Sequence, residues 1–366
     1  MRIPPAMKQI LLTGGTGLVG SAFAAASLAA GHRVLCLARN DPDGERTWSA
    51  IVSAAEGFGL SFASDVRTRL TVENVLFERL AEHLTEALLR DVDEVWHAAA
   101  EMSFSPHRVA QSFHQNVTVT ALLHLAVSRH APRCRRFYYV STAFTAGNAG
   151  GDTYETLHSA PILINGYQIS KWGAEMMLAA EHAHGVPVTL VRTTGVVGHR
   201  QSAWCGNSHF GLYLFVDLVA AVRASGGREL CLDVRTAARP NLVPIDSVID
   251  VCTRLSARDQ SARELEIFHC VGEALVTTGD LFAAVGDVFQ VAVRFDSRQS
   301  AFDEMAMKAL SEVQPFVEIH WQWDSAALAR ALPGFVPPPV DVTMVRRFAE
   351  TRVAWPPRRL ARVAAG

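Results

Sequence analysis

The sequence predicts an α/β protein: a Rossmann-type, doubly wound parallel sheet with a smaller, mostly C-terminal substrate-binding region. Three observations support this fold class. Short apolar runs alternate with segments of helical periodicity, a glycine-rich turn joins the first run to the first helix, and a later run ends in two adjacent hydroxyl side chains. Ligands of such sheets bind at the carboxyl ends of the strands. Functional residues are therefore expected at those ends.

The composition is that of an ordinary globular protein. Of 366 residues, 49% are hydrophobic and 19% charged, and the formal net charge is -2, which gives no general affinity for nucleic acid. The six cysteines lack the spacing of a disulfide framework or zinc site, so we expect reduced thiols and assign no metal. We find neither a signal peptide nor an apolar run of about 20 residues. A cytoplasmic protein with no membrane span is expected.

The chain opens with a βαβ unit. Residues 9–12 read as a short apolar strand, 14–20 as a glycine-rich turn, 18–30 as a helix and 33–37 as a second strand. A glycine motif between a strand and a helix is typical of dinucleotide binding. A purely structural turn is the alternative.

Each glycine of this turn has a distinct expected role. Gly14 makes the tight turn, Gly17 lets backbone N–H groups approach a pyrophosphate, and Gly20 allows close packing of helix on strand. The phosphate would then lie at the positive end of the helix. The expected cofactor contacts from this stretch are Thr13, Gly14, Thr16, Gly17, Leu18, Val19 and Gly20.

The end of the second strand indicates which dinucleotide is bound. Where an acidic residue would hold the 2′-hydroxyl of NAD, the chain has Ala38, Arg39 and Asn40. The planar guanidinium of Arg39 suits a 2′-phosphate. We therefore expect NADPH as cofactor, with NADH less favoured. A solvated surface charge is the alternative for Arg39.

Further strands and helices follow in alternation. Residues 40–69 read as a helical insertion, 70–76 as a third strand, 94–100 as a fourth strand and 116–126 as a helix. The fourth strand ends in small residues, Ala98 and Ala99, which let the backbone run beside a cofactor ribose. A packed strand end would have the same composition.

The fifth strand, residues 137–144, carries the hydroxyl pair Ser141 and Thr142. At the carboxyl end of a parallel strand, a hydroxyl points into the crevice where ligands bind. Such a pair can also satisfy only local backbone groups.

A later helix places Tyr167 and Lys171 four residues apart, on one face. An ammonium near the phenol favours its ionised form, which predicts that Tyr167 is a proton donor with a lowered pKa. An ordinary amphipathic helix with a surface lysine is the competing interpretation.

These motifs together resemble the extended short-chain dehydrogenase/reductase family. The likeness covers about residues 9–249 and rests on TGGTGLVG, HAAA, STAFTAG, the Tyr-x-x-x-Lys pair, VRTTGVVG at 191–198 and NLVPIDSV at 241–248. It implies a catalytic triad of Thr142, Tyr167 and Lys171. The further cofactor contacts that it implies are Asn74 (where the family has Asp), Val75, His97, Ala98, Ala99, Ser141, Thr194 and Val196, with Lys171 on the nicotinamide ribose.

Within that family, the chain resembles the thioester reductase branch, which includes reductases of carboxylic acid reductases and non-ribosomal peptide synthetases and the fatty acyl-CoA reductases. The likeness rests on Arg39, the long insertion after it, His97 with Phe104, and Thr142 in place of Ser. It implies NADPH-dependent reduction of an acyl thioester, carried by CoA or by a separate acyl or peptidyl carrier protein, to an aldehyde or alcohol. The alternatives are a sugar-nucleotide epimerase or dehydratase, a hydroxysteroid-type dehydrogenase, and a non-enzymatic dinucleotide sensor.

The resemblance suggests a division of the chain. Residues 1–198 plus about 238–252 form the NADP-binding domain, and about 199–237 and 253–366 form the substrate-binding region. The apolar helix 210–222 lines an acyl channel or packs in a core. A basic C-terminal stretch is either a solvated end or a docking surface for an acidic carrier protein; its arginines are Arg346, Arg347, Arg352, Arg358, Arg359 and Arg362.

Overall fold

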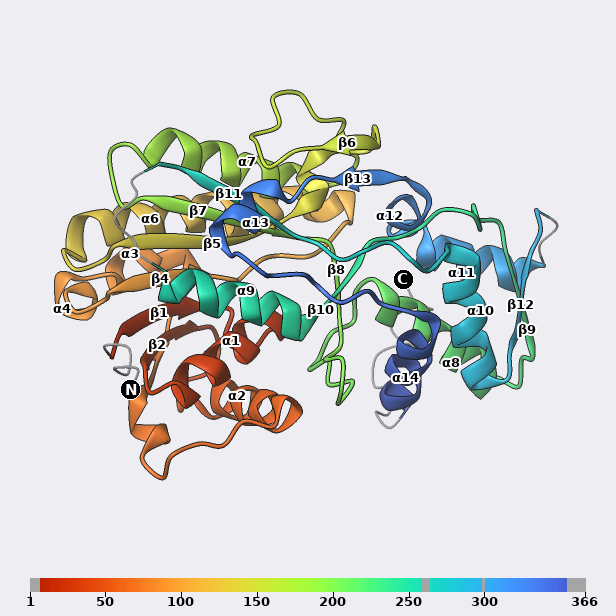
Figure 1. The fold of residues 1–366 in the computed structure, drawn as a ribbon, viewed down its shortest axis with the longest axis horizontal. Helices are drawn as coiled ribbons and strands as arrows, with labels where there is room; N and C mark the ends of the chain where they lie inside the picture. Colours follow the sequence, from red (N-terminus) through yellow and green to blue (C-terminus); the bar gives the residue numbers. More distant parts are fainter. Residues whose placement is uncertain (1–6, 259–263, 298–299, 354–366) are drawn as a thin grey trace.

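A seven-stranded parallel sheet forms the centre of the molecule, in the order β11-β7-β5-β4-β1-β2-β3 (Figure 1). The computed structural model describes residues 7–258, 264–297 and 300–353. The strands are β1 (Gln9–Thr13), β2 (Arg33–Ala38), β3 (Leu70–Asn74), β4 (Glu94–His97), β5 (Arg136–Thr142), β7 (Val188–Thr193) and β11 (Glu266–Cys270). The order reverses between β1 and β4, as in doubly wound folds. The predicted fold class is confirmed.

Helices cover both faces of this sheet, because successive strand residues point to opposite sides. Ile10 and Leu12 pack into the core on one face, while Leu11 packs into the core on the other. The first face is covered by α1 (Leu18–Ala29), α2 (Glu45–Phe58) and α9 (Ile245–Ala257), and the second by α3 (Leu80–His83), α4 (Glu86–Leu89), α6 (Val119–His130) and α7 (Gly166–Glu181).

A separate hydrophobic core lies beyond the sheet, at the right of Figure 1. The rings of Phe215 and Phe282 stack at its centre, with centroids 3.9 Å apart. The elements around it are α8 (Leu212–Ala224), β9 (Glu229–Leu232), α10 (Thr278–Phe289), β12 (Ala292–Phe295), α11 (Ala301–Leu310) and α14 (Val342–Val353). Most of the apolar stretch 210–222 packs in this core, which agrees with the prediction that it forms part of a core.

Two short parallel pairs connect the sheet to this second core. They join β8 (Gly195–Val197) to β10 (Leu242–Pro244) and β6 (Gly151–Thr153) to β13 (Trp321–Trp323). The remaining helices are η1 (Val66–Arg69), η2 (Phe77–Arg79), η3 (Pro106–Arg108), α5 (Val109–Phe113), η4 (His114–Thr118), η5 (Ala143–Ala146), α12 (Gln314–Glu318) and α13 (Ala326–Ala331). Among the described residues, no helix is long and apolar enough to cross a membrane.

The structure differs from the predicted division at β11. The prediction assigned residues from 253 onward to the substrate-binding region, but Glu266–Cys270 pairs with β7 and forms an edge of the central sheet. The run EIFHC is short and partly polar, so its pattern does not distinguish a sheet strand from a loop. The insertion 40–69 is also only partly helical, because α2 ends at Phe58 and η1 begins at Val66.

Candidate active site

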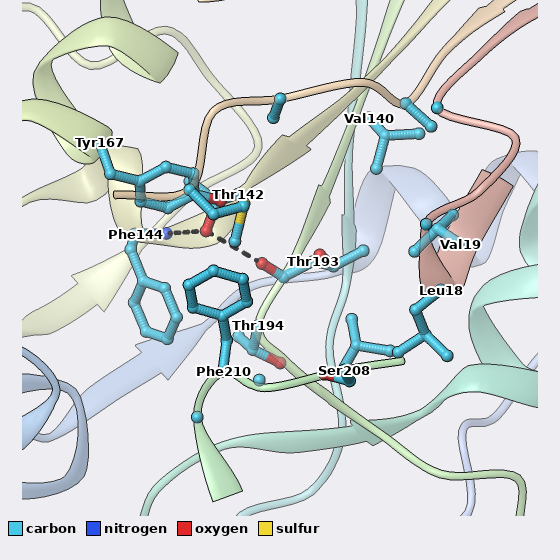
Figure 2. Close-up of a pocket in the computed structure, with 18 of the residues that line it drawn as sticks. Leu18, Val19, Val140, Thr142, Phe144, Tyr167, Thr193, Thr194, Ser208 and Phe210 are labelled. Carbon is cyan, nitrogen blue, oxygen red and sulfur yellow. Dashed lines mark hydrogen bonds between the residues drawn. The ribbon is translucent and has the colours of Figure 1, made fainter. Parts of the chain in front are cut away.

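A cavity of about 730 Å³ opens where β1, β4, β5 and β7 end. Its wall contains the glycine-rich turn on one side, Thr142, Tyr167 and Lys171 on another, and Phe215 and other residues of the second core beyond them. Figure 2 shows Tyr167 beside Thr142, with Leu18 and Val19 across the pocket. The structure therefore brings the predicted triad and most of the predicted cofactor contacts into one space.

The glycine-rich turn forms a cradle that side chains would fill. Gly14 has a φ of +79°, and a Cβ on Gly20 would lie 2.1 Å from the carbonyl oxygen of Gly14. A Cβ on Gly14 would lie 2.7 Å from the backbone nitrogen of Ala99, which follows β4. Gly17 precedes α1 and offers no side-chain cap, so the first N–H groups of the helix face the cavity side of the turn. These features fit a dinucleotide pyrophosphate.

Fifteen of the predicted site residues line this cavity, and four do not. Those that line it are Gly14, Thr16, Gly17, Leu18, Val19, Gly20, Arg39, Ala98, Ala99, Ser141, Thr142, Tyr167, Lys171, Thr194 and Val196. Thr13, Asn74, Val75 and His97 lie behind it. Val75 is buried in the sheet core, and Asn74 Oδ1 accepts a hydrogen bond of 2.8 Å from the backbone of Asp41, so both support the cavity wall.

Thr13 and His97 join adjacent strands beneath the turn. The Thr13 hydroxyl lies 2.5 Å from His97 Nδ1, and His97 Nε2 lies 2.8 Å from the Thr120 hydroxyl on α6. Burial lowers the pKa of His97 to about 3, so its imidazole is neutral. The Thr13 hydroxyl also accepts from the backbone N–H of Ala99, which fixes the loop that lines the cavity.

Two arginines lie together at the cofactor end of the cavity. Arg39 Nη1 donates to Gln115 Oε1 over 3.2 Å, and its guanidinium lies 5.0 Å from the Phe77 ring centroid. Arg46 Nη2 donates to the backbone oxygen of Arg39. Neither guanidinium forms an ion pair with a described carboxylate. Sequence reasoning missed Arg46 and Gln115, because neither belongs to a spaced motif.

The Thr142 side chain links the end of β5 to the end of β7 and to η5. Its hydroxyl donates to the backbone oxygen of Thr193 and accepts from the N–H of Phe144, each over 3.3 Å, as Figure 2 shows. Figure 2 shows Tyr167 beside this hydroxyl. Burial raises the pKa of Tyr167 to about 12, and the neighbouring Thr142 hydroxyl opposes that rise only in part. The predicted lowering of this pKa is wrong for this structure, because desolvation outweighs the favourable contacts.

Lys171 is buried with its ammonium directed to the sheet. Its Nζ donates to the backbone oxygen of Val140 over 2.7 Å and lies 3.9 Å from the centroid of the Tyr139 ring. Burial lowers the pKa of Lys171 to about 7, while the negative charge of Glu175 acts in the opposite direction. The lysine is therefore poised to change its charge near neutral pH.

A buried ion pair lies one helical turn beyond Lys171. Glu175 accepts from Arg192 Nη2 over 2.8 Å and from Nε over 3.0 Å, and both side chains are fully buried. The Ser141 hydroxyl donates to the same carboxylate over 2.5 Å. This bidentate pair joins α7, β7 and the end of β5. Tyr167, Lys171 and Glu175 occupy one helix face at successive turns.

Asn116 is a further residue that the sequence prediction did not single out. It lies in the π-helical turn η4, and its Nδ2 donates to the Ser170 hydroxyl over 2.9 Å and to the backbone oxygen of Glu101 over 3.0 Å. It thereby ties α7 to the loop after β4. The pattern predicted an ordinary helix from 116, because a single π-helical turn leaves the apolar periodicity almost unchanged.

Aromatic rings form the wall next to Tyr167. Phe104 lies 5.5 Å from the Tyr167 ring and 5.5 Å from Phe316, and Phe316 lies 4.6 Å from Phe144, all between ring centroids. Phe316 comes from α12, far away in the sequence. The part of the cavity beyond Tyr167 has no charged lining residue among those described, since Arg39, Arg46 and Lys171 belong to the cofactor side.

The basic C-terminal stretch is not free where the structure describes it. Arg346 pairs with Asp287 over 2.6 Å, and the buried Arg352 pairs with Asp217 over 3.0 Å. Arg358, Arg359 and Arg362 lie outside the described residues. Because Arg346 and Arg352 pair with carboxylates of the same chain and hold α14 in place, they do not support the hypothesis that this stretch docks an acidic carrier protein.

A glycine cradle for a dinucleotide beside a buried tyrosine and lysine is the arrangement of short-chain dehydrogenases and reductases, and the chain is an NAD(P)-dependent oxidoreductase of this type. More specifically, it belongs to the family described as male sterility protein, an NAD-binding family whose model matches residues 12–252. The predicted family and its likeness to the thioester reductase branch are confirmed.

Curated relatives are much longer than this chain. The hybrid PKS-NRPS synthetase poxE of Penicillium oxalicum is 31% identical over 201 residues, which are 52% of this chain and 4% of that protein. An isonitrile lipopeptide synthase of Streptomyces coeruleorubidus is 27% identical over 212 residues, which are 55% of this chain and 14% of that protein. The chain therefore spans only a small part of the length of these relatives.

Solved structures share the fold over nearly the whole chain. The terminal R domain from the myxalamid PKS-NRPS biosynthetic pathway superposes with a TM-score of 0.73 at 22% identity, covering 96% of this chain and 92% of that one. DesIV, a dTDP-glucose 4,6-dehydratase from Streptomyces venezuelae, superposes with a TM-score of 0.69 at 22% identity, covering 95% and 99%. At this identity, both comparisons speak for the fold.

We predict that Glu175→Gln lowers the pKa of Lys171, because the carboxylate charge that raises it is removed. Only three lysines, at positions 8, 171 and 308, are present, so the side-chain signals of isotopically labelled lysine can be assigned and titrated by NMR. Glu181→Gln, an exposed change at the end of the same helix, should leave the titration unaltered. An unchanged or raised Lys171 pKa in Glu175→Gln would contradict the coupling.

Proposed function

We propose that the protein reduces an acyl thioester to an aldehyde, or by a second reduction to an alcohol, with NADPH as the reductant. One observation carries this proposal: the dinucleotide cradle, the Thr142–Tyr167–Lys171 group and an apolar wall line the same cavity. The similarity to PKS-NRPS synthetases supports a substrate held on an acyl or peptidyl carrier protein, with CoA as the other carrier of the same chemistry.

The cavity favours an acyl group over a nucleotide sugar. Phe104 packs against Tyr167, and Phe316 packs against both Phe104 and Phe144. The second core adds Phe215 and Phe282 to the cavity wall. Apolar surface of this kind stabilises a hydrocarbon chain by removing it from water. A sugar diphosphate would need cationic groups on the substrate side of the cavity, and none of the described lining residues there is charged. An epimerase or dehydratase reaction is therefore less well supported.

A dinucleotide held by the glycine cradle would supply the hydride, and with it the two electrons, that the thioester carbonyl carbon accepts. Tyr167, neutral because its pKa is about 12, donates its proton to the carbonyl oxygen. The Thr142 hydroxyl lies beside the phenol and helps to hold the oxygen as negative charge develops there. The C–S bond of the resulting hemithioacetal then breaks, with the proton passing from oxygen to sulfur, to give the aldehyde and a free thiol.

Lys171 has two proposed roles in this reaction. When protonated, its charge offsets the negative charge left on the Tyr167 oxygen, and its Nζ can hydrogen-bond to the nicotinamide ribose. The bond to Val140 and the nearby Tyr139 ring keep the ammonium at the cavity wall. Arg39 and Arg46 would bind the 2′-phosphate that distinguishes NADPH from NADH, since a guanidinium pair suits a phosphate dianion.

The proposal is tested by supplying the protein with NADPH and a panel of acyl-CoA and acyl-carrier thioesters, and by following cofactor oxidation and thiol release. Aldehyde or alcohol should form together with free thiol. Reduction of free aldehydes alone would replace thioester reduction with aldehyde reduction. Conversion of a UDP-sugar without net cofactor consumption would favour the epimerase alternative, and NADPH binding without any turnover would favour a sensor.

Replacing Tyr167 with Phe is expected to lower kcat by roughly 10²–10⁴-fold, because the proton donor is lost. The dissociation constant for NADPH should be nearly unchanged. The matched control is Tyr154→Phe, since Tyr154 is 55% exposed and does not line the cavity. Near-normal turnover of Tyr167→Phe would exclude the phenol as the proton donor.

Replacing Arg39 with Ala is expected to raise the KM for NADPH about tenfold or more, because charge-assisted hydrogen bonds to the 2′-phosphate are lost. The KM for NADH should change little. Arg33→Ala provides the control, because Arg33 is exposed at the opposite end of β2. Equal rises for the two cofactors would show that Arg39 does not read the 2′-phosphate.

A further inference from the structure

A second hollow, of about 670 Å³, adjoins the cavity. The segment between β9 and β10 lines most of it, and Val234 of that segment lines both hollows, so the two meet there. The residues around the second hollow are Val234, Arg235, Thr236, Ala237, Ala238, Arg239, Glu318 and His320. Arg235, Arg239, Glu318 and His320 bring ionisable groups to this hollow, whereas the adjoining wall of the cavity has no charged residue among those described.

Arg235 and Arg239 supply the positive charge. Both are exposed, and neither forms an ion pair with a carboxylate in the described part of the chain. Arg239 Nη1 donates to the backbone oxygen of Leu275 over 2.8 Å, which fixes one guanidinium at the hollow. Both guanidinium groups belong to residues on the wall of the same hollow, where a bound oxyanion would accept charge-assisted hydrogen bonds.

The acidic residue of this wall, Glu318, offsets only one of the two positive charges. Glu318 Oε1 accepts from the backbone N–H of Arg235 over 3.0 Å and from the side-chain amide of Gln314 over 2.9 Å. Its carboxylate is therefore engaged with amides and holds the segment in place. The hollow keeps a net positive charge, with the hydroxyl of Thr236 and the imidazole of His320 also on its wall.

The same arrangement occurs on the cofactor side. Arg39 and Arg46 line the cavity there and also lack a carboxylate partner among the described residues. The cavity is thus flanked by two arginine pairs, with apolar residues between them. One pair suits the phosphate of the dinucleotide. The other lines the second hollow, which shares Val234 with the substrate side of the cavity.

We propose that Arg235 and Arg239 bind the phosphate ester at the far end of the pantetheine arm of the thioester substrate. This inference rests on the proposed thioester reduction. The arm carries no charge between its sulfur and its phosphate, so the apolar cavity takes the acyl group while the phosphate is the first anion along the chain. Carrier-bound and CoA-bound substrates share this phosphate, and the planar guanidinium groups match its oxygens.

Equilibrium binding tests the phosphate site without requiring that the protein turn over a substrate. Calorimetry with 4′-phosphopantetheine and with pantetheine should show at least about tenfold tighter binding of the phosphorylated compound. The double variant Arg235→Ala, Arg239→Ala should abolish that difference. Arg228→Ala, which removes an exposed arginine that lines neither hollow, should preserve it. Equal affinities for the two compounds in the unmodified protein, or an equal loss in Arg228→Ala, would overturn the site.

Turnover then identifies the source of the phosphate. The double variant should raise the KM about tenfold for acyl-CoA and for the acyl carrier, and leave both the acyl-pantetheine KM and kcat unchanged. A KM that rises for the acyl carrier but not for acyl-CoA would overturn the phosphate site, because the two arginines would then contact the carrier protein itself. Tighter binding of UDP than of phosphopantetheine, lost in the double variant, would overturn it in favour of a sugar nucleotide. If no thioester is reduced, the proposed function fails, whereas the binding comparison still decides the phosphate site.

Discussion

The buried ion pair between Glu175 and Arg192 fixes the geometry on which the chemistry depends. A lone charge at this depth would cost several kcal/mol, so each partner confines the other. Glu175 belongs to the helix that carries Tyr167 and Lys171, and Arg192 to the strand beside β5. Ser141, next to Thr142, donates to the same carboxylate. One carboxylate therefore sets the spacing between the hydroxyl group and the tyrosine and lysine.

Burial also determines the charge distribution of the site. It raises the pKa of Tyr167 and lowers that of Lys171, so the neutral form of each group is favoured next to the reacting carbonyl. Arg39 and Arg46 line the cavity at its cofactor end, at the glycine-rich turn. Hydroxyl groups and aromatic rings, not charged side chains, therefore surround the Tyr167 phenol. Recognition of charged groups is left to the periphery.

The sequence predicted the sheet and the local motifs because both have short-range signals. The glycine turn, the strand-end hydroxyl of Thr142 and the Tyr167–Lys171 spacing are read within a few residues, and all line one cavity. The aromatic wall was not predictable, because Phe316 joins Phe104 and Phe144 only through tertiary packing. The pKa of Tyr167 was predicted in the wrong direction, since burial cannot be read from helical spacing. The edge strand β11 lacked a distinctive pattern.

The two sides of the cavity rest on different hydrophobic cores. Phe215 and Phe282 stack in that core and also line the cavity, whereas the glycine turn and the catalytic face of α7 rest on the sheet cores. Substitutions that reshape the acyl side therefore act on a packing unit of their own. The nucleotide-binding half need not be rebuilt when the substrate changes. Under the proposed function, the acyl group that is accepted would thus depend on one core that can be varied by itself.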